Sequence, residues 1–203
     1  MKKLFIIGGM GAGKSTARKA LVDEGLPFID LDVVGHDVLK WGIVKEELRE
    51  AFGDDVFGED GEVNRRALAA KAFLTPYDTR MLNRITLPRI EDTYMQIVDK
   101  LEAEGHEAVV VEYSVFKNRE IGFMNSADVV IAVLAKLETR VARAVAAGWD
   151  EDDVRRRIAR QITDAVRLEE ADVVFNNDDT PEELRNQVVS WWRGYKAREF
   201  KLG

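Results

Sequence analysis

The stretch KLFIIGGMGAGKST, residues 3–16, decides the interpretation of this 203-residue sequence. Lys3 to Ile7 is a short apolar run of the kind found in buried β-strands. Thr16 to Glu24 has helical spacing and is followed by Gly25, a common helix stop. Between them, Gly8 to Ser15 fits the pattern GxxxxGK[ST]. The stretch therefore predicts a strand, a phosphate-binding loop and a helix in succession.

Each part of this loop has a physical task in holding a nucleotide. Glycines permit the tight turn that aims backbone N–H groups at phosphate oxygens, and the following helix presents its positive end to the same anion. Lys14 would meet the β- and γ-phosphates, and the Ser15 hydroxyl would ligate Mg²⁺. We expect ATP and Mg²⁺ as cofactors, with the nucleotide bound by Gly8, Gly9, Met10, Gly11, Ala12, Gly13, Lys14, Ser15 and Thr16.

Composition narrows the class of protein. A formal net charge of −7 argues against a general nucleic-acid partner, because such binders use a basic excess to neutralise phosphates. The absence of cysteine excludes disulfides and zinc–thiolate sites and fits a cytoplasmic protein. No apolar run approaches the roughly 20 residues that span a bilayer, so we expect no membrane association. The length fits one P-loop domain, as a monomer or small homo-oligomer.

Strands alternate with helices along the chain, which predicts an α/β fold with a doubly wound parallel sheet. Further strands are expected at 28–29, 108–111, 128–134 and 173–175, and helices at 137–147, 150–170 and 181–196. The block from about 34 to 105 is mainly helical, with a bend expected near Pro88. We therefore predict a P-loop NTPase three-layer sandwich. Its core covers about 1–33, 106–136 and 171–203, with a helical substrate-binding region at about 34–105 and a helical lid at about 137–170.

Acidic residues follow two of the predicted strands. Ligands gather at the carboxyl ends of parallel strands, so Asp32 is a candidate to accept a proton from an acceptor hydroxyl or to help hold Mg²⁺. The alternative for Asp32 is a capping acid for the next helix. Glu112 ends another apolar run and is either a substrate contact, a more distant Mg²⁺ contact or a solvated acid.

Arginines concentrate in the predicted lid. Arginines carried by a closing lid stabilise charge on a phosphoryl group in transfer, and a lid excludes water. The alternative is a solvated helix face with ion pairs to neighbouring acids. We expect at least one of them to reach a phosphate. The candidates are Arg140, Arg143, Arg155, Arg156, Arg157 and Arg160.

Several ordered motifs together resemble the dephospho-CoA kinase family over nearly the whole chain. FIDLDVVGH (28–36) is similar to the family's acid-x-acid stretch, and GEVNRRAL (61–68) with Phe73 resembles its substrate-region pattern. The resemblance continues through Leu82-Asn83, Pro88-Arg89-Ile90, Arg143, Arg157-Ile158, Gln161, Ala171-Asp172 and Asn177. The combination is more specific than any single motif.

This resemblance implies transfer of phosphate from ATP to the ribose 3′-hydroxyl of dephospho-CoA, the last step of coenzyme A biosynthesis. It implies Asp32 as base, and Lys14 and Arg143 as phosphate stabilisers. His36 and Arg65 would take the CoA-side substrate, and Asn177 would lie near the ATP base or its loop.

The sequence departs from the family pattern at four positions: Leu87 in place of histidine, Lys117 in place of an acid, Ala147 near the position of a second lid arginine, and Asp178 in place of glycine. Two other functions therefore stay open. One is a related P-loop kinase for a nucleoside, a nucleotide or another small-molecule hydroxyl. The other is a nucleotide-binding pseudo-kinase without transfer activity.

Overall fold

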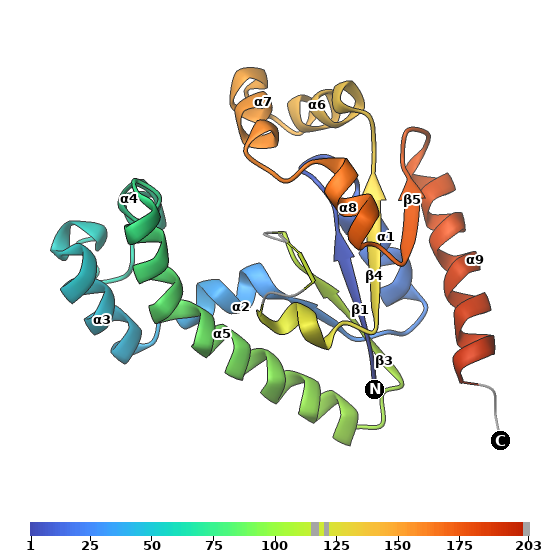
Figure 1. Ribbon diagram of the computed structural model, residues 1–203, viewed down its shortest axis with the longest axis horizontal. Helices are drawn as coiled ribbons and strands as arrows, with labels where there is room; N and C mark the ends of the chain where they lie inside the picture. Colours follow the sequence, from blue (N-terminus) through green and yellow to red (C-terminus); the bar gives the residue numbers. More distant parts are fainter. Residues whose placement is uncertain (115–117, 120–121, 201–203) are drawn as a thin grey trace. The chain divides into compact units, whose positions relative to one another are not determined.

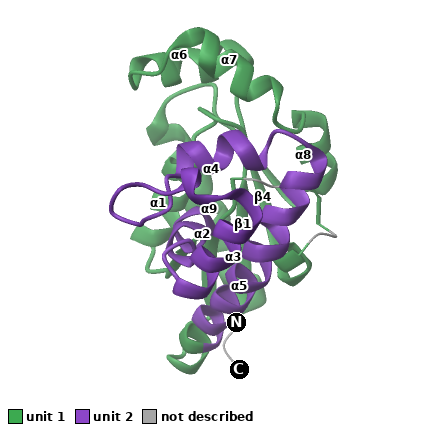
Figure 2. Ribbon diagram, turned by 90° about the vertical axis from the view of Figure 1, so that its left-hand side faces the viewer, with its two compact units in different colours: residues 1–30, 100–203 green, residues 31–99 purple. Residues whose placement is uncertain are grey.

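The computed structural model describes residues 1–114, 118–119 and 122–200. The chain divides into two compact units, residues 1–30 with 100–203 and residues 31–99 (Figure 2). Lys117, one of the departures noted above, lies outside the described residues. Within the described part of the chain, no helix has the length and apolar character needed to cross a membrane.

The first unit is built on a five-stranded parallel sheet. Its strands are β1 (Lys2–Ile7), β2 (Phe28–Asp30), β3 (Ala108–Glu112), β4 (Val129–Leu134) and β5 (Val173–Asn176), in the order β2-β3-β1-β4-β5. The connection from β1 runs to β2 at one edge of the sheet, and the connection from β4 runs to β5 at the opposite edge. The order therefore reverses between β1 and β4, the place where open α/β sheets form a ligand crevice. The predicted α/β fold is confirmed.

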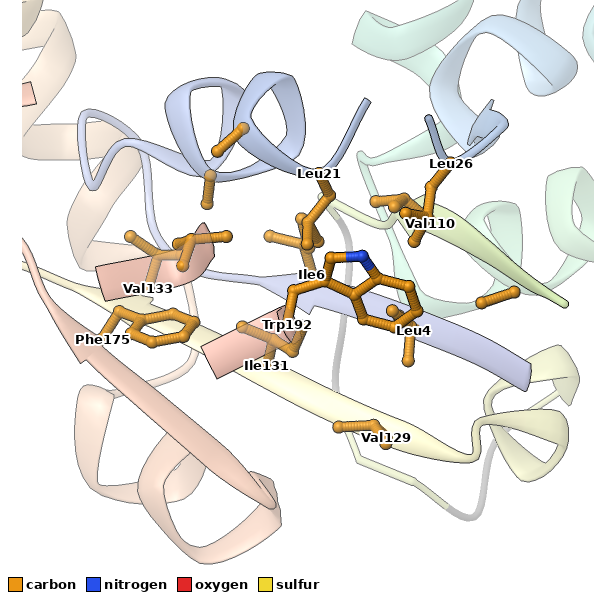
Figure 3. Packing of buried hydrophobic residues seen from close by; sticks show 14 of the residues in the cluster. Leu4, Ile6, Leu21, Leu26, Val110, Val129, Ile131, Val133, Phe175 and Trp192 are labelled. Carbon is orange, nitrogen blue, oxygen red and sulfur yellow. The ribbon is translucent and has the colours of Figure 1, made fainter. Parts of the chain in front are cut away.

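Two helices cover one face of this sheet and bury its main core. Helix α1 (Lys14–Asp23) and helix α9 (Pro181–Glu199) lie together on that face (Figure 1). Leu21 of α1 and Trp192 of α9 pack against alternate residues of the strands, among them Leu4 and Ile6 (Figure 3). Trp192 is only 3% exposed, and the neighbouring Trp191 is partly buried against the same core, so both tryptophans of α9 serve packing. This packing fixes the start of α1, where the phosphate-binding loop ends.

The predicted lid contains one more break than the sequence indicated. Helix α6 (Leu137–Ala146) is followed by α7 (Glu151–Ala159) and α8 (Asp164–Glu170), so the single helix predicted for 150–170 is wrong. The Thr163 side chain accepts a hydrogen bond from Val166 N and starts a new helix. The interruption leaves Gln161 outside both helices, with its side chain available to another part of the fold.

Residues 31–99 form a helical unit with a core of its own. The elements are α2 (Leu31–Val38), α3 (Gly42–Phe52), the 3₁₀ turn η1 (Asp54–Val56), α4 (Arg65–Ala72) and α5 (Pro76–Ala103), whose last residues belong to the first unit. Helix α5 continues through Pro88, so proline does not end it. The core consists of Val38, Val44, Leu48, Phe52, Val56, Leu68, Ala72 and Ile85.

Candidate active site

The loop between β1 and α1 has the backbone form that a phosphate-binding loop requires. Gly13 caps α1 with φ +102°, a left-handed conformation that favours glycine. A Cβ added at Gly13 would collide with the Asn177 side-chain amide, and one at Gly9 would collide with the Arg140 guanidinium. Both glycines are therefore required by close packing of other groups against the loop. Their neighbours Arg140 and Asn177 are both buried.

The functional side chains of the loop lie at the start of α1. Lys14 Nζ donates a hydrogen bond to the Gly8 carbonyl at 3.1 Å, which folds the lysine back over the loop. Ser15 lies exposed in the first turn of the helix, next to Thr16. The lysine cation and the serine hydroxyl are thus close to the helix N-terminus, where an anion is stabilised.

Arg18, one turn further along α1, gathers the acids that end two neighbouring strands. Asp30 of β2 pairs in register with Glu112 of β3. Arg18 donates a hydrogen bond to Glu112 at 3.0 Å and lies 3.9 Å from Asp30, while its guanidinium stacks over the Phe28 ring. Glu112 thus forms an ion pair at the strand ends, a contact that was not among the alternatives predicted for it. No motif of the sequence indicated Arg18 as its partner.

Asp32 belongs to the helical unit and lies in the first turn of α2, two residues after β2 ends. In the same unit, Arg65 Nη1 at the start of α4 lies 3.1 and 2.7 Å from the two ring nitrogens of His36, and the nitrogen that carries no hydrogen in the neutral ring can accept its hydrogen bond. These two residues, with Lys40 and Glu62, line an open cavity of about 440 Å³. The structure therefore brings His36 and Arg65 together at one cavity, whose lining also includes the apolar residues Val33, Leu39 and Val63.

Arg143 is held at the carboxyl end of β5. Its guanidinium donates to the Asn177 carbonyl at 2.7 Å and to the Asp179 carbonyl at 3.0 Å. Asn177 in turn donates its side-chain amide to the Ala12 carbonyl at 2.8 Å and its backbone N–H to Leu134 O at 2.7 Å. Arg143 is thus connected to the phosphate-binding loop through one residue, Asn177.

Arg140 contacts the loop directly. This arginine is 5% exposed, and its Nε donates to the Met10 carbonyl at 2.9 Å. Burial lowers the pKa of the Arg140 guanidinium, and the nearby Asp164 carboxylate opposes that shift. Gln161 accepts a hydrogen bond from Met10 N at 3.0 Å and another from Arg140 at 3.2 Å. The sequence pattern placed Arg140 and Gln161 in the lid. It did not reveal that both form hydrogen bonds with the backbone of one loop residue, Met10.

The other four arginines that were candidates to reach a phosphate lie at or near the surface. Arg155 pairs with Glu138 and Glu151, and Arg156 and Arg157 both pair with Asp153. Such exposed pairs contribute little to stability and leave the side chains free to move. Arg160, at the end of α7, is exposed and precedes Gln161.

Comparison with known proteins agrees with this arrangement. The family model described as dephospho-CoA kinase matches residues 4–183. A dephospho-CoA kinase of Corynebacterium efficiens is 41% identical over 190 residues, covering 93% of this chain and 94% of that protein. The chain belongs to the dephospho-CoA kinase family. Membership accounts for the order of motifs from the phosphate-binding loop to Asn177, and it makes this chain a kinase that uses ATP and a small-molecule acceptor.

Solved structures support the same fold for this family member. TT1252 from Thermus thermophilus superposes with a TM-score of 0.82 at 27% identity, over 95% of this chain and 97% of that one. Dephospho-CoA kinase from Campylobacter jejuni gives a TM-score of 0.64 at 20% identity, over 95% and 96% of the two chains. At that identity the second likeness concerns the fold alone.

Proposed function

We propose that this chain phosphorylates the ribose 3′-hydroxyl of dephospho-CoA with ATP, giving CoA and ADP in the last step of coenzyme A biosynthesis. The observation that carries the proposal is the phosphate-binding loop. Gly13 in its left-handed conformation joins β1 to α1, and Lys14 and Ser15 stand at the helix start. The fit of this loop to the pattern GxxxxGK[ST] supports its assignment as the nucleotide site.

On the nucleotide side, the backbone from Gly8 to Thr16 cradles the phosphates. Lys14 exchanges the Gly8 carbonyl for the β- and γ-phosphate oxygens, a stronger charged partner. The exposed Ser15 hydroxyl suits a Mg²⁺ ion that keeps its other ligands from phosphates and water. Bound there, Mg²⁺ neutralises charge on the phosphates. The loop at Asn177 lies against the base of ATP.

On the acceptor side, Asp32 accepts the proton of the 3′-hydroxyl. The hydroxyl oxygen forms a bond to the γ-phosphorus, and the bond from that phosphorus to the β-γ bridging oxygen breaks. ADP leaves with the electron pair of that bond. His36 and Arg65 bind an anionic part of the CoA-side substrate, since they line the same cavity and Arg65 carries a positive charge. Glu112, which forms an ion pair with Arg18, is a further candidate contact for the substrate.

Arg143 stabilises charge on the phosphoryl group in this proposal. Its guanidinium is bound by the carbonyls of Asn177 and Asp179, so contact with the nucleotide requires exchange of at least one of these neutral acceptors for a phosphate. A charged acceptor makes the stronger hydrogen bond, so the exchange is favourable. We further propose a cytoplasmic enzyme, monomeric or a small homo-oligomer, with no nucleic-acid partner in view of its charge of −7.

The test is the identity of the product. The protein is incubated with Mg-ATP and dephospho-CoA, and the position of the new phosphate is read by phosphorus NMR after chromatography. The proposal expects a 3′-phosphomonoester of dephospho-CoA together with an equal amount of ADP. CoA, whose 3′-position is already phosphorylated, is the matched control acceptor and should give no product. ADP without a phosphorylated acceptor would contradict the proposal.

A further inference from the structure

Met10 lies in the middle of the phosphate-binding loop, and both its backbone N–H and its backbone carbonyl form hydrogen bonds with residues of the lid. Its N–H donates to Gln161 Oε1 at 3.0 Å, and its carbonyl accepts from Arg140 Nε at 2.9 Å. Gln161 follows α7, and Arg140 lies in α6. The loop and the lid are separated by about 130 to 150 positions, so these bonds join two distant parts of the sequence at one peptide.

The two lid residues are also bonded to each other. Arg140 Nη2 donates to the same Gln161 oxygen that receives the Met10 N–H, at 3.2 Å. Arg140 Nη1 lies 3.4 Å from Asp164, which also binds the buried Arg167 at 2.5 Å. A planar guanidinium fixed at three nitrogens has little freedom to rotate. Arg140 therefore holds both Gln161 and the loop in one geometry.

Apolar packing reinforces the same contact. The Met10 side chain packs against the small lid cluster of Val141, Ala144 and Val154, together with Ile158. Gly9 has no room for a Cβ because the Arg140 guanidinium occupies that space. Two residues of the phosphate-binding loop thus contact the lid. Met10 does so through its backbone and side chain, and Gly9 does so because the Arg140 guanidinium fills the space that a side chain would need.

We propose that Arg140 and Gln161 are positioning residues that hold the phosphate-binding loop in its nucleotide-binding curve, so that the lid segment sets the affinity for the nucleotide. Neither residue touches the phosphates in this account. They act through the backbone N–H and carbonyl of Met10, a residue within the phosphate-binding loop. If these hydrogen bonds are lost, the loop samples other conformations. A smaller fraction of the protein is then competent to bind ATP, and the apparent affinity for ATP falls.

The test separates positioning from general stabilisation. Gln161→Met keeps the length of the side chain but removes the oxygen that accepts both bonds. We expect the dissociation constant for ADP, measured by titration calorimetry, to rise roughly tenfold, the effect of losing one to two hydrogen bonds. The matched control is Gln187→Met, the same change at an exposed residue of α9, which should leave ADP binding as in wild type. All proteins are measured at a temperature where their far-UV spectra show a folded state.

A conservative variant provides the rescue. Gln161→Glu retains an acceptor for both Met10 N–H and Arg140. The guanidinium groups of Arg140 and Arg167 share a single carboxylate partner, Asp164. We expect its ADP dissociation constant to stay within about threefold of wild type. An ADP affinity of Gln161→Met equal to wild type would overturn the proposal, whatever its melting temperature. Equal losses in Gln161→Met and Gln161→Glu would overturn it too.

This inference rests on the proposed function only in its use of a nucleotide. Because ADP binding needs no acceptor, the result is informative even if dephospho-CoA proves to be the wrong substrate. Where turnover can be measured, Arg140→Lys should raise the KM for ATP more than the KM for the acceptor, since lysine keeps the charge but cannot bond Met10, Gln161 and Asp164 together. An equal rise in both KM values would contradict the positioning role.

Discussion

The Asn177 side-chain amide donates a hydrogen bond to the Ala12 carbonyl at 2.8 Å and thereby joins the end of β5 to the phosphate-binding loop. Both the amide and the carbonyl are removed from solvent, since Asn177 is 4% exposed and Ala12 is 1% exposed. A buried carbonyl that loses its donor costs free energy that no water recovers. The shape of the loop therefore depends on a residue that follows it by 165 positions.

Asn177→Asp tests this relationship with almost no change in shape. The substitution replaces the donor by a carboxylate oxygen facing the Ala12 carbonyl, so we expect the free energy of unfolding to fall by about 1–3 kcal/mol. ADP affinity should fall with it. Asn176→Asp is the matched control, because Asn176 is the exposed neighbour that ends β5. Chemical denaturation and calorimetry check both effects, and equal behaviour of the two variants would refute the role given to Asn177.

Substitutions at two glycines distinguish the effect of backbone strain from the effect of a steric collision. Gly13 has φ +102° and no room for a Cβ beside Asn177, whereas Gly25 has φ +94° and open space. Gly25→Ala should lower the free energy of unfolding by about 1–2 kcal/mol, the cost of a left-handed residue with a side chain, and leave ADP binding intact. Gly13→Ala should lose more stability and bind ADP weakly. Wild-type ADP affinity in Gly13→Ala would show that the loop tolerates the collision.

Asp32→Asn tests the proposed base. The amide cannot accept the hydroxyl proton in the transition state, so we expect kcat with dephospho-CoA to fall by about 10²- to 10⁴-fold. The ADP dissociation constant should change little. Asp92→Asn, at an exposed acid of α5, controls for the loss of a surface charge. If kcat of Asp32→Asn stayed within a few-fold of wild type, Asp32 would not be the base.

The cap of α9 predicts a dependence of stability on pH. Thr180 and Glu183 form a reciprocal capping box, and hydrogen bonds from the Thr180 backbone N–H and hydroxyl hold the pKa of Glu183 below its usual 4.5. A depressed pKa means that Glu183 contributes stability above pH 4.5 and loses it as the pH falls through the folded pKa.

Glu183→Ala should therefore destabilise the protein at pH 7, and the difference from wild type should shrink as the pH falls below 4.5. Urea denaturation at several pH values measures this difference. Glu182→Ala, at the neighbouring exposed acid of the same first turn, is the control and should show a smaller dependence. If the free energy of unfolding of Glu183→Ala differed from that of wild type by the same amount at every pH, the stabilising role given to ionised Glu183 would be contradicted.

The fold followed from local signals in the sequence. The strand from Lys3, the glycine loop and the helix stop at Gly25 predicted β1, the phosphate-binding loop and α1, because apolar runs and glycines act over a few residues. The same reasoning predicted a helix beginning at residue 181, and α9 begins at Pro181. Strand order could not be worked out this way, since pairing joins β1 to β3 and β4 across about a hundred residues.

The sequence predicted which residues belong to the candidate site better than it predicted which residues they contact. Lys14 and Ser15 were identifiable because the loop motif prescribes their spacing. The contacts of Arg140 and Gln161 with Met10 were not, because the sequence of α7 and α8 reads as one charged helix and conceals the break at Gln161. The pairing of Arg18 with Glu112 likewise depends on strand register, which composition does not reveal.

The central claim is that this phosphate-binding loop transfers phosphate from ATP to dephospho-CoA. The most direct test measures ADP formation from Mg-ATP with and without dephospho-CoA, for wild type and for Lys14→Ala. The account predicts that dephospho-CoA strongly stimulates ADP formation by wild type and that Lys14→Ala abolishes the stimulation. Wild type that binds ATP but shows no stimulation by dephospho-CoA would contradict the account and favour a different acceptor or a protein without transfer activity.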